Sequence, residues 1–247
     1  MSKTGSAAIS GTLRHTVPTN PLEPLGPIDR RLLRSAGFTG TVGSLLLLAV
    51  FVFVGALGLP DPFTPESLLR FPEIQYAGAV ENLLFLAAIV LWAVHHELLY
   101  RLLRITAPVL SAAARTVGLL GVAMVAAGAL LNVATATMSQ AYQQAAEADR
   151  SVVVLAWQAA QGVMHALLVT GALLLPAAVV LFGIALRRGQ SPIPGWGAVV
   201  LGTAGTAAAV VAATTQPSTL DAVAVSILGT LIFHLVAGIR WLRLSRS

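Results

Sequence analysis

Apolar residues occur along the chain in six long runs separated by short polar segments. The runs cover about 38–59, 76–100, 117–138, 151–186, 196–213 and 220–239. A helix that crosses a bilayer needs about 17 to 25 predominantly apolar residues, and every run reaches that length. The pattern therefore predicts an all-α, polytopic membrane bundle with six transmembrane helices.

The fourth run is longer than a membrane is thick. Residues 151–186 carry no formal charge, and as a helix they would measure about 54 Å at 1.5 Å per residue. The hydrocarbon core is only about 30 Å thick. We expect one long helix, kinked near Pro176, that either projects beyond the outer surface or begins along the interface.

The chain before the first run is polar and forms a predicted cytoplasmic tail, residues 1–36, ahead of a single six-helix domain, residues 37–243. Its prolines repeat every three residues, which favours a polyproline II spacer. These prolines are Pro18, Pro21, Pro24 and Pro27.

The first outer loop contains a helix-start pattern. Thr64 is a candidate N-cap, Pro65 suits the first helical position and Glu66 follows in the first turn. We expect a short interfacial helix that ends before Pro72.

Composition and charge agree with a membrane protein. Hydrophobic residues make up 56% of the chain and charged residues 10%, with a mean hydropathy of +0.82. The net charge of +5 does not indicate nucleic acid, because the basic residues flank the apolar runs instead of gathering on one soluble face. Thirteen of the fifteen lysines and arginines lie on one predicted side, and only Arg70 and Arg150 lie on the other. The positive-inside rule then places both termini in the cytoplasm. We expect the chain to lie in the plasma membrane.

Several kinds of chemistry are excluded or unsupported. The chain has no cysteine, and its one lysine, Lys3, lies outside every run, which excludes thiolate metal sites and an intramembrane Schiff base. Nucleotide-binding, zinc-protease and serine-hydrolase motifs are missing. The sequence thus favours a protein that is not an enzyme, and no cofactor is predicted. The expected partners are the lipid bilayer and a small molecule, an ion or another membrane protein.

Two segments carry a family resemblance. The first is Leu102–Pro108, which leads into the third run, and the second is Leu181–Gln190, which is followed by Pro194, Gly195 and Trp196. Their order resembles bacterial six-span integral membrane proteins that are grouped as a domain of unknown function. The resemblance implies a six-helix topology and no established activity or site residue.

Polar residues inside the runs are costly in lipid and are therefore functional candidates. One layer lies 17 to 22 residues from the cytoplasmic arginine that ends each helix, or about 25 to 33 Å, and so near the outer face. It contains Glu81, Asn132, His165 and Asp221.

Two stripes extend this outer layer, because residues three and four apart share one face of a helix. They are Asn132, Thr135 and Ser139 on the third run, and Gln158, Gln161 and His165 on the fourth. We expect consecutive antiparallel helices to bring Asn132, Gln161 and His165 together, with Glu81 as the charge partner of His165. The arrangement would form a pocket for a ligand or ion, or a set of interhelical hydrogen bonds without a ligand.

A second layer consists of histidines. His95 and His234 each lie six residues before the arginine that ends the helix, about 9 Å from the cytoplasmic edge. Equal depth would suit a bis-histidine haem or a metal ion, and the alternative is interfacial side chains bonded to carbonyls. His95, His96 and Glu97 point about 100° apart and cannot all join one site. We expect the imidazoles of His95 and His234 to lie apart.

The sequence thus favours an integral plasma-membrane protein that acts as a binding, transport-like or accessory component, with a polar pocket near the outer face. A membrane haem or metal redox protein that uses His95 and His234 is one alternative. The other is an intramembrane hydrolase that activates water with His165 and either Glu81 or Asp221.

Overall fold

The computed structural model describes residues 27–59, 63–189, 192–214 and 220–246, and every regular element in these ranges is helical. The helices are α1 (Pro27–Leu57), α2 (Pro65–Leu103), α3 (Pro108–Gln144), η1 (Glu147–Asp149), α4 (Arg150–Gly189), α5 (Pro192–Thr214) and α6 (Leu220–Leu244). Six of them are long and apolar enough to cross a membrane. The predicted all-α fold and its six helices of membrane-spanning length are therefore confirmed for this part of the chain.

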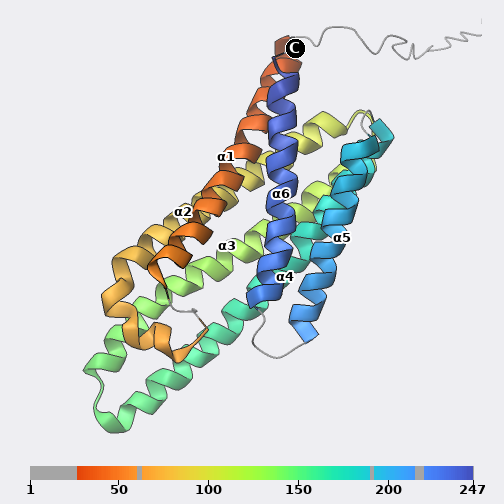
Figure 1. The fold of residues 1–247 in the computed structure, drawn as a ribbon. Coiled ribbons are helices and arrows are strands. Elements are labelled where there is room, and N and C mark those ends of the chain that lie inside the picture. The colour runs from red at the N-terminus through yellow and green to blue at the C-terminus, as the bar shows by residue number, and fades with distance from the viewer. Residues whose placement is uncertain (1–26, 60–62, 190–191, 215–219, 247) are drawn as a thin grey trace, which may run out of the picture.

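The helices form one closed bundle. Each long helix packs against the next in sequence, and α6 also packs against α1 and α4. Figure 1 shows the start of α1 beside the end of α6 at one end of the bundle. The turn between α3 and α4 lies at the opposite end, beyond the ends of α5 and α6 (Figure 1).

The fourth predicted span is a single helix. α4 contains 40 residues and continues through Pro176 without a break in its assignment. This confirms the expected long helix, and its outer part extends with α3 beyond the neighbouring helices (Figure 1). The kink near Pro176 stays a prediction.

The first helix begins earlier than the sequence indicated. α1 starts at Pro27, inside the segment predicted as a tail, and Pro27 suits the first helical position because its missing N–H has no helical partner there. Leu33 and Ala36 are buried, so these turns pack against the bundle. Pro18, Pro21 and Pro24 lie outside the described residues.

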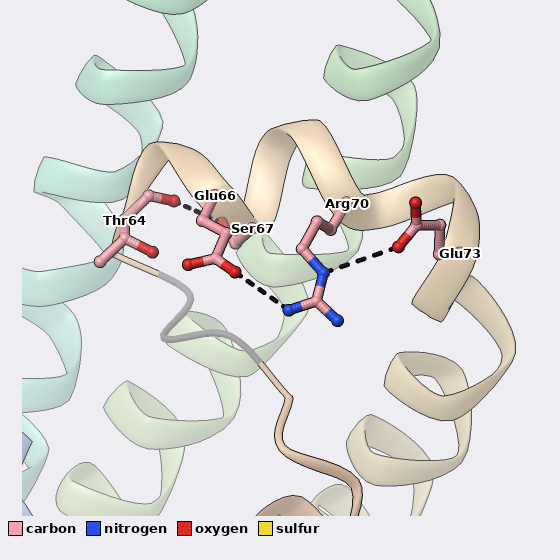
Figure 2. A network of polar contacts seen from close by, with 5 residues as sticks. All are labelled: Thr64, Glu66, Ser67, Arg70 and Glu73. Atoms are coloured by element: carbon pink, nitrogen blue, oxygen red, sulfur yellow. Dashed lines mark hydrogen bonds and ion pairs between the residues drawn. The ribbon is translucent and has the colours of Figure 1, made fainter.

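The predicted short interfacial helix is not a separate element. Its residues form the first turns of α2, which runs through Pro72. Figure 2 shows these turns lying across the helices behind them and the ribbon turning between Arg70 and Glu73. Arg70 pairs there with Glu66 at 3.0 Å and with Glu73 at 3.6 Å. Ion pairs this exposed add little to stability.

The apolar core consists of two main clusters along the bundle. One cluster includes Leu99, Phe182 and Phe233. The other includes Trp92 and Leu175. Residues of both clusters contact buried histidines, so the core itself surrounds the inner polar layer.

Candidate functional site

The two outer stripes meet between α3 and α4. The amide nitrogen of Gln161 donates a hydrogen bond to the Thr135 hydroxyl at 3.4 Å, and both side chains are buried. The expected antiparallel pairing of these helices thus brings the middle of each stripe together. The contact is an interhelical hydrogen bond of the kind that membrane bundles use for packing.

Ser139, in the same stripe, bonds to the backbone of α2. Its hydroxyl donates to the Leu68 carbonyl at 2.8 Å, and both residues are buried. Leu68 precedes Pro72 by four residues, and a proline has no N–H to give to that carbonyl. Ser139 therefore replaces the helical hydrogen bond that Pro72 removes.

The remaining outer candidates do not form the expected ion pair. His165 contacts the Phe63 ring edge to face, with centroids 5.5 Å apart. His165, Glu81 and Asn132 are half-buried, and no salt bridge joins His165 to Glu81, although both residues are described. The pairing predicted from their equal depths is wrong, because equal depth does not fix the direction of a side chain around its helix.

Two further outer candidates lie elsewhere. Gln158 is exposed on the surface of α4, so the stripe of Gln158, Gln161 and His165 does not turn as a whole into the bundle. Asp221 belongs to α6, but its side chain lies outside the described residues.

The inner histidines come together, against the expectation that they lie apart. The rings of His95 and His234 have centroids 4.9 Å apart with an interplanar angle of 76°. His96 contacts the same His234 ring at the same distance and angle. All three side chains are 0% exposed. His95 and His96 thus both contact the His234 ring, and these three imidazoles are called the histidine cluster below.

Sequence reasoning missed His96 as a member of this cluster. Adjacent residues of a helix point about 100° apart, and this angle was taken to keep His95 and His96 out of one site. The His234 ring, on another helix, faces the gap between them and contacts both. Only Glu97 points away, since it pairs with Arg101 at 2.9 Å and with Arg115.

Aromatic rings enclose the histidine cluster. Trp92 stacks on His234 with centroids 4.6 Å apart, and Phe182 stacks on His96 at 5.6 Å. The Trp92 indole has a partner of its own, because its N–H donates to the Ser44 hydroxyl at 3.4 Å. The two rings that stack on the cluster are thus apolar or already hydrogen-bonded.

Glycines make the cluster possible. A Cβ atom at Gly40 of α1 would lie 2.5 Å from the His95 ring and 2.8 Å from the His234 carbonyl oxygen. A Cβ at Gly118 of α3 would meet the His96 ring at 3.0 Å. Real Cβ atoms essentially never approach as closely as at Gly40 and seldom as closely as at Gly118, so the missing side chains at these two positions let the imidazoles sit between helices.

Hydrogen bonding is incomplete in the cluster. His95 Nδ1 lies 2.8 Å from the Ala36 carbonyl oxygen. A carbonyl only accepts, so Nδ1 carries the proton and Nε2 keeps its lone pair. Among the described residues, His95 Nε2 and both ring nitrogens of His96 and of His234 have no hydrogen-bond partner. Five of six buried ring nitrogens without a partner is costly unless something else binds them.

The geometry does not suit a haem. Two axial imidazoles on opposite faces of a haem have centroids roughly 6 Å apart, with the macrocycle between them. The His95 and His234 rings touch at 4.9 Å, and Trp92 and Phe182 occupy the flanks. A complete metal site is not preformed either, since no group of three or more His, Asp or Glu side chains in the described ranges converges as ligands.

No protein-family model, curated protein or solved structure matches this chain. Its class follows from its helices alone: six apolar helices that are compatible with an integral membrane protein, packed around a buried histidine cluster. Its function is therefore inferred from the chemistry of the histidine cluster.

Proposed function

We propose that this protein is a multi-pass binding component of the plasma membrane, with both termini in the cytoplasm, that holds a transition-metal ion at the histidine cluster. The observation that carries the proposal is the set of five buried ring nitrogens without a hydrogen-bond partner among the described residues. The resemblance to bacterial six-span membrane proteins is part of the same proposal and assigns no residue. In this proposal the hydrogen bonds of the outer polar layer are structural and bind no ligand.

His95 is arranged as a metal ligand. Histidine ligands usually donate the N–H of one ring nitrogen to a carbonyl or carboxylate, which fixes the tautomer and directs the other nitrogen to the metal. The Ala36 carbonyl does this for His95 Nδ1 and leaves Nε2 with its lone pair. His95 Nε2 is buried and has no partner among the described residues.

His234 is the second proposed ligand. Two imidazoles on one metal at ~2 Å per bond have centroids roughly 5 to 6 Å apart, and the observed 4.9 Å is close to that range. His96 contacts the same His234 ring and becomes the third ligand if its own ring turns.

The neutral charge of the proposed ligands determines which metal ions the site favours. The proposed ligands are neutral imidazoles, and the adjacent carboxylate, Glu97, is engaged by Arg101 and Arg115. A divalent ion without an anionic ligand is expensive in a low-dielectric interior, and a monovalent ion costs much less. Imidazole also suits copper. Cu(I), which accepts two or three ligands, therefore fits the cluster best.

The experiment measures Cu(I) affinity of the protein purified in mild detergent. Under anaerobic conditions with ascorbate, the protein competes with the chromogenic chelator bicinchoninate for Cu(I). We expect one Cu(I) per chain, and a loss of affinity of about a hundredfold or more in His95→Gln and in His234→Gln. Zn²⁺ serves as a second probe, and we expect weaker binding.

The matched control is His165→Gln, which removes a histidine outside the cluster and should bind Cu(I) like the unchanged protein. Size-exclusion elution and helical circular dichroism verify that each variant folds. If the unchanged protein binds no Cu(I), or if all three variants bind it equally, the histidine cluster is structural and the proposed function is wrong.

The proposed orientation has its own test. Reporter fusions after Ser247 and in the turn near Arg150 should report opposite sides of the membrane, because thirteen basic residues lie on one predicted side and two on the other. Identical reports from both fusions would contradict the six-span topology.

A further inference from the structure

The Ser44 hydroxyl joins three helices beside the histidine cluster. Ser44 lies on α1, which packs against both α2 and α6, and its side chain is 0% exposed. The hydroxyl donates to the Leu231 carbonyl oxygen of α6 at 3.2 Å and accepts from the indole N–H of Trp92 on α2 at 3.4 Å. A hydroxyl has one donor and two acceptor sites, so it makes both contacts at once. One side chain thus connects the helices that carry His95 and His234.

The ring of His234 has no hydrogen bond that sets its orientation. The Ala36 carbonyl fixes the ring of His95, but neither ring nitrogen of His234 has a hydrogen-bond partner among the described residues. Rotation about the Cβ–Cγ bond of a histidine is soft and allows a broad range of angles. The plane of the His234 ring is therefore determined by packing.

Trp92 determines that plane. Its indole stacks on the His234 ring with centroids 4.6 Å apart and an interplanar angle of 26°. Both side chains are fully buried, so the imidazole cannot turn without pushing against the indole. A metal ion bonds in the plane of an imidazole, along the lone pair of a ring nitrogen. The plane that Trp92 imposes therefore decides whether His234 and His95 reach the same ion.

The neighbours of Ser44 hold the indole in place. A Cβ atom at Gly43 would lie 2.9 Å from Trp92 Cδ1, so a side chain at that position would push the indole away from α1. Leu231 lies three residues before His234 and so shares its face of α6. The Ser44 hydroxyl thus contacts α6 on the face that presents His234, and its two hydrogen bonds fix the indole relative to the imidazole.

His96 lacks such an arrangement. Phe182 stacks on its ring with centroids 5.6 Å apart, but a phenyl ring has no N–H that a hydroxyl could hold. The contact of a hydroxyl with a stacked indole is therefore particular to His234.

We propose that Ser44 is a positioning residue for His234: through the indole of Trp92, it holds the imidazole in the plane that a metal ion shared with His95 requires. Ser44 itself does not touch the ion. As an account of metal binding the inference rests on the proposed function, but the orientation of the ring in the metal-free protein is measured without it. Both hydrogen bonds are long, so we expect a moderate effect.

The first measurement is the Cu(I) affinity of the full chain in mild detergent, by competition with bicinchoninate. Ser44→Ala should lose about tenfold, the lower end of the effect that outer-shell partners of metal ligands have. Trp92→Phe keeps an aromatic ring, removes the N–H and should lose at least as much. The double variant should bind about as well as Trp92→Phe alone, because Ser44 acts through the indole.

The second measurement is the NMR spectrum of the metal-free protein with labelled histidine. A stacked indole shifts the ring protons of an imidazole upfield. The signals of His234 are identified by their loss in His234→Gln. We expect them upfield in the unchanged protein and nearer their ordinary positions in Ser44→Ala, which a merely structural role of the hydroxyl would not produce.

The matched control is Ser226→Ala. Ser226 of α6 is also fully buried, and its hydroxyl donates to the Ala172 carbonyl oxygen of α4 at 2.6 Å. It lies eight residues before His234, or about 12 Å along the helix. The substitution therefore removes a buried interhelical hydrogen bond away from the histidine cluster. It should lower stability and leave both the Cu(I) affinity and the His234 signals unchanged.

The possible results distinguish the positioning role from the proposed function. If the unchanged protein binds Cu(I) and Ser44→Ala binds it equally well, the positioning role is wrong and the proposed function stands. An equal loss in Ser226→Ala, or additive losses in the double variant, also overturns the positioning role, since Ser44 would then act through general packing. If the unchanged protein binds no Cu(I), the proposed function is wrong and the NMR signals decide. Shifted His234 signals in Ser44→Ala then support the positioning role, and unshifted signals overturn it.

Discussion

The outer and inner polar layers of the bundle were both predicted by counting residues from the helix ends, but they differ in their hydrogen bonding. In the outer layer, Ser139 and Gln161 bond to groups on neighbouring helices. In the inner layer, three imidazoles contact one another, and only one ring nitrogen reaches a hydrogen-bond partner among the described residues. Packing accounts for these two outer side chains, whereas the inner imidazoles call for a ligand.

The difference depends on which backbone groups are accessible. Within a helix each carbonyl is bonded to the N–H four residues later, so a neighbouring side chain reaches it only at a break or an open surface. Pro72 leaves the Leu68 carbonyl for Ser139. Gly40, four residues after Ala36, leaves the Ala36 carbonyl open for His95. His96 and His234 lie where no such carbonyl is in reach.

The largest expected effect is metal-linked stability. With Cu(I) at a hundred times its dissociation constant, the unchanged protein should gain about 2.7 kcal/mol against unfolding, because the ion binds the folded state. His95→Gln should gain almost nothing, and His165→Gln should gain as much as the unchanged protein. Denaturant unfolding in detergent, with and without Cu(I), measures the three differences. A gain that His95→Gln retains would place the metal elsewhere.

The next effect compares a glycine in each layer. Gly40→Ala should destabilise the protein by about 1 to 3 kcal/mol, because its Cβ would lie 2.5 Å from the His95 ring, in a packed interior. Gly162→Ala, on α4 in the outer layer, meets no atom within 4 Å and should be neutral or gain up to about 1 kcal/mol. Unfolding in detergent compares the two. A neutral Gly40→Ala would mean that α1 does not pack against the His95 ring this closely.

The sequence predicted the helices well and the sites only in part. Six apolar runs give six helices, because run length and the absence of charge depend on local sequence alone. The equal depth of His95 and His234 could also be predicted, since it needs only a residue count. Their contact could not be predicted, because it depends on how α2 and α6 are rotated about their axes. The glycines that fix this rotation, such as Gly40, resemble any other small residue of a membrane helix until the packing is known.

A smaller effect tests the role of Ser139. Ser139→Ala should cost about 1 to 2 kcal/mol, because it leaves the buried Leu68 carbonyl without a donor opposite Pro72. In a Pro72→Ala background the N–H of residue 72 supplies that hydrogen bond, so the same substitution should cost much less. Thr137→Ala, on the exposed face of α3, is the control and should be neutral. Additive costs in the double-mutant cycle would contradict the replacement of the helical bond by Ser139.

The smallest effect distinguishes packing from binding in the outer layer. Thr135→Val keeps the shape of the side chain and removes the acceptor of the Gln161 hydrogen bond, which at 3.4 Å is long. Interhelical hydrogen bonds in membranes contribute about 0.6 kcal/mol on average, so we expect a loss of about that size. Gln158→Leu, on the exposed face of the same helix, removes an amide with no role in that contact and should leave unfolding in detergent unchanged. A larger loss for Gln158→Leu than for Thr135→Val would mean that the exposed amide contacts a partner or ligand, and the outer layer would then regain the role that its sequence pattern first suggested.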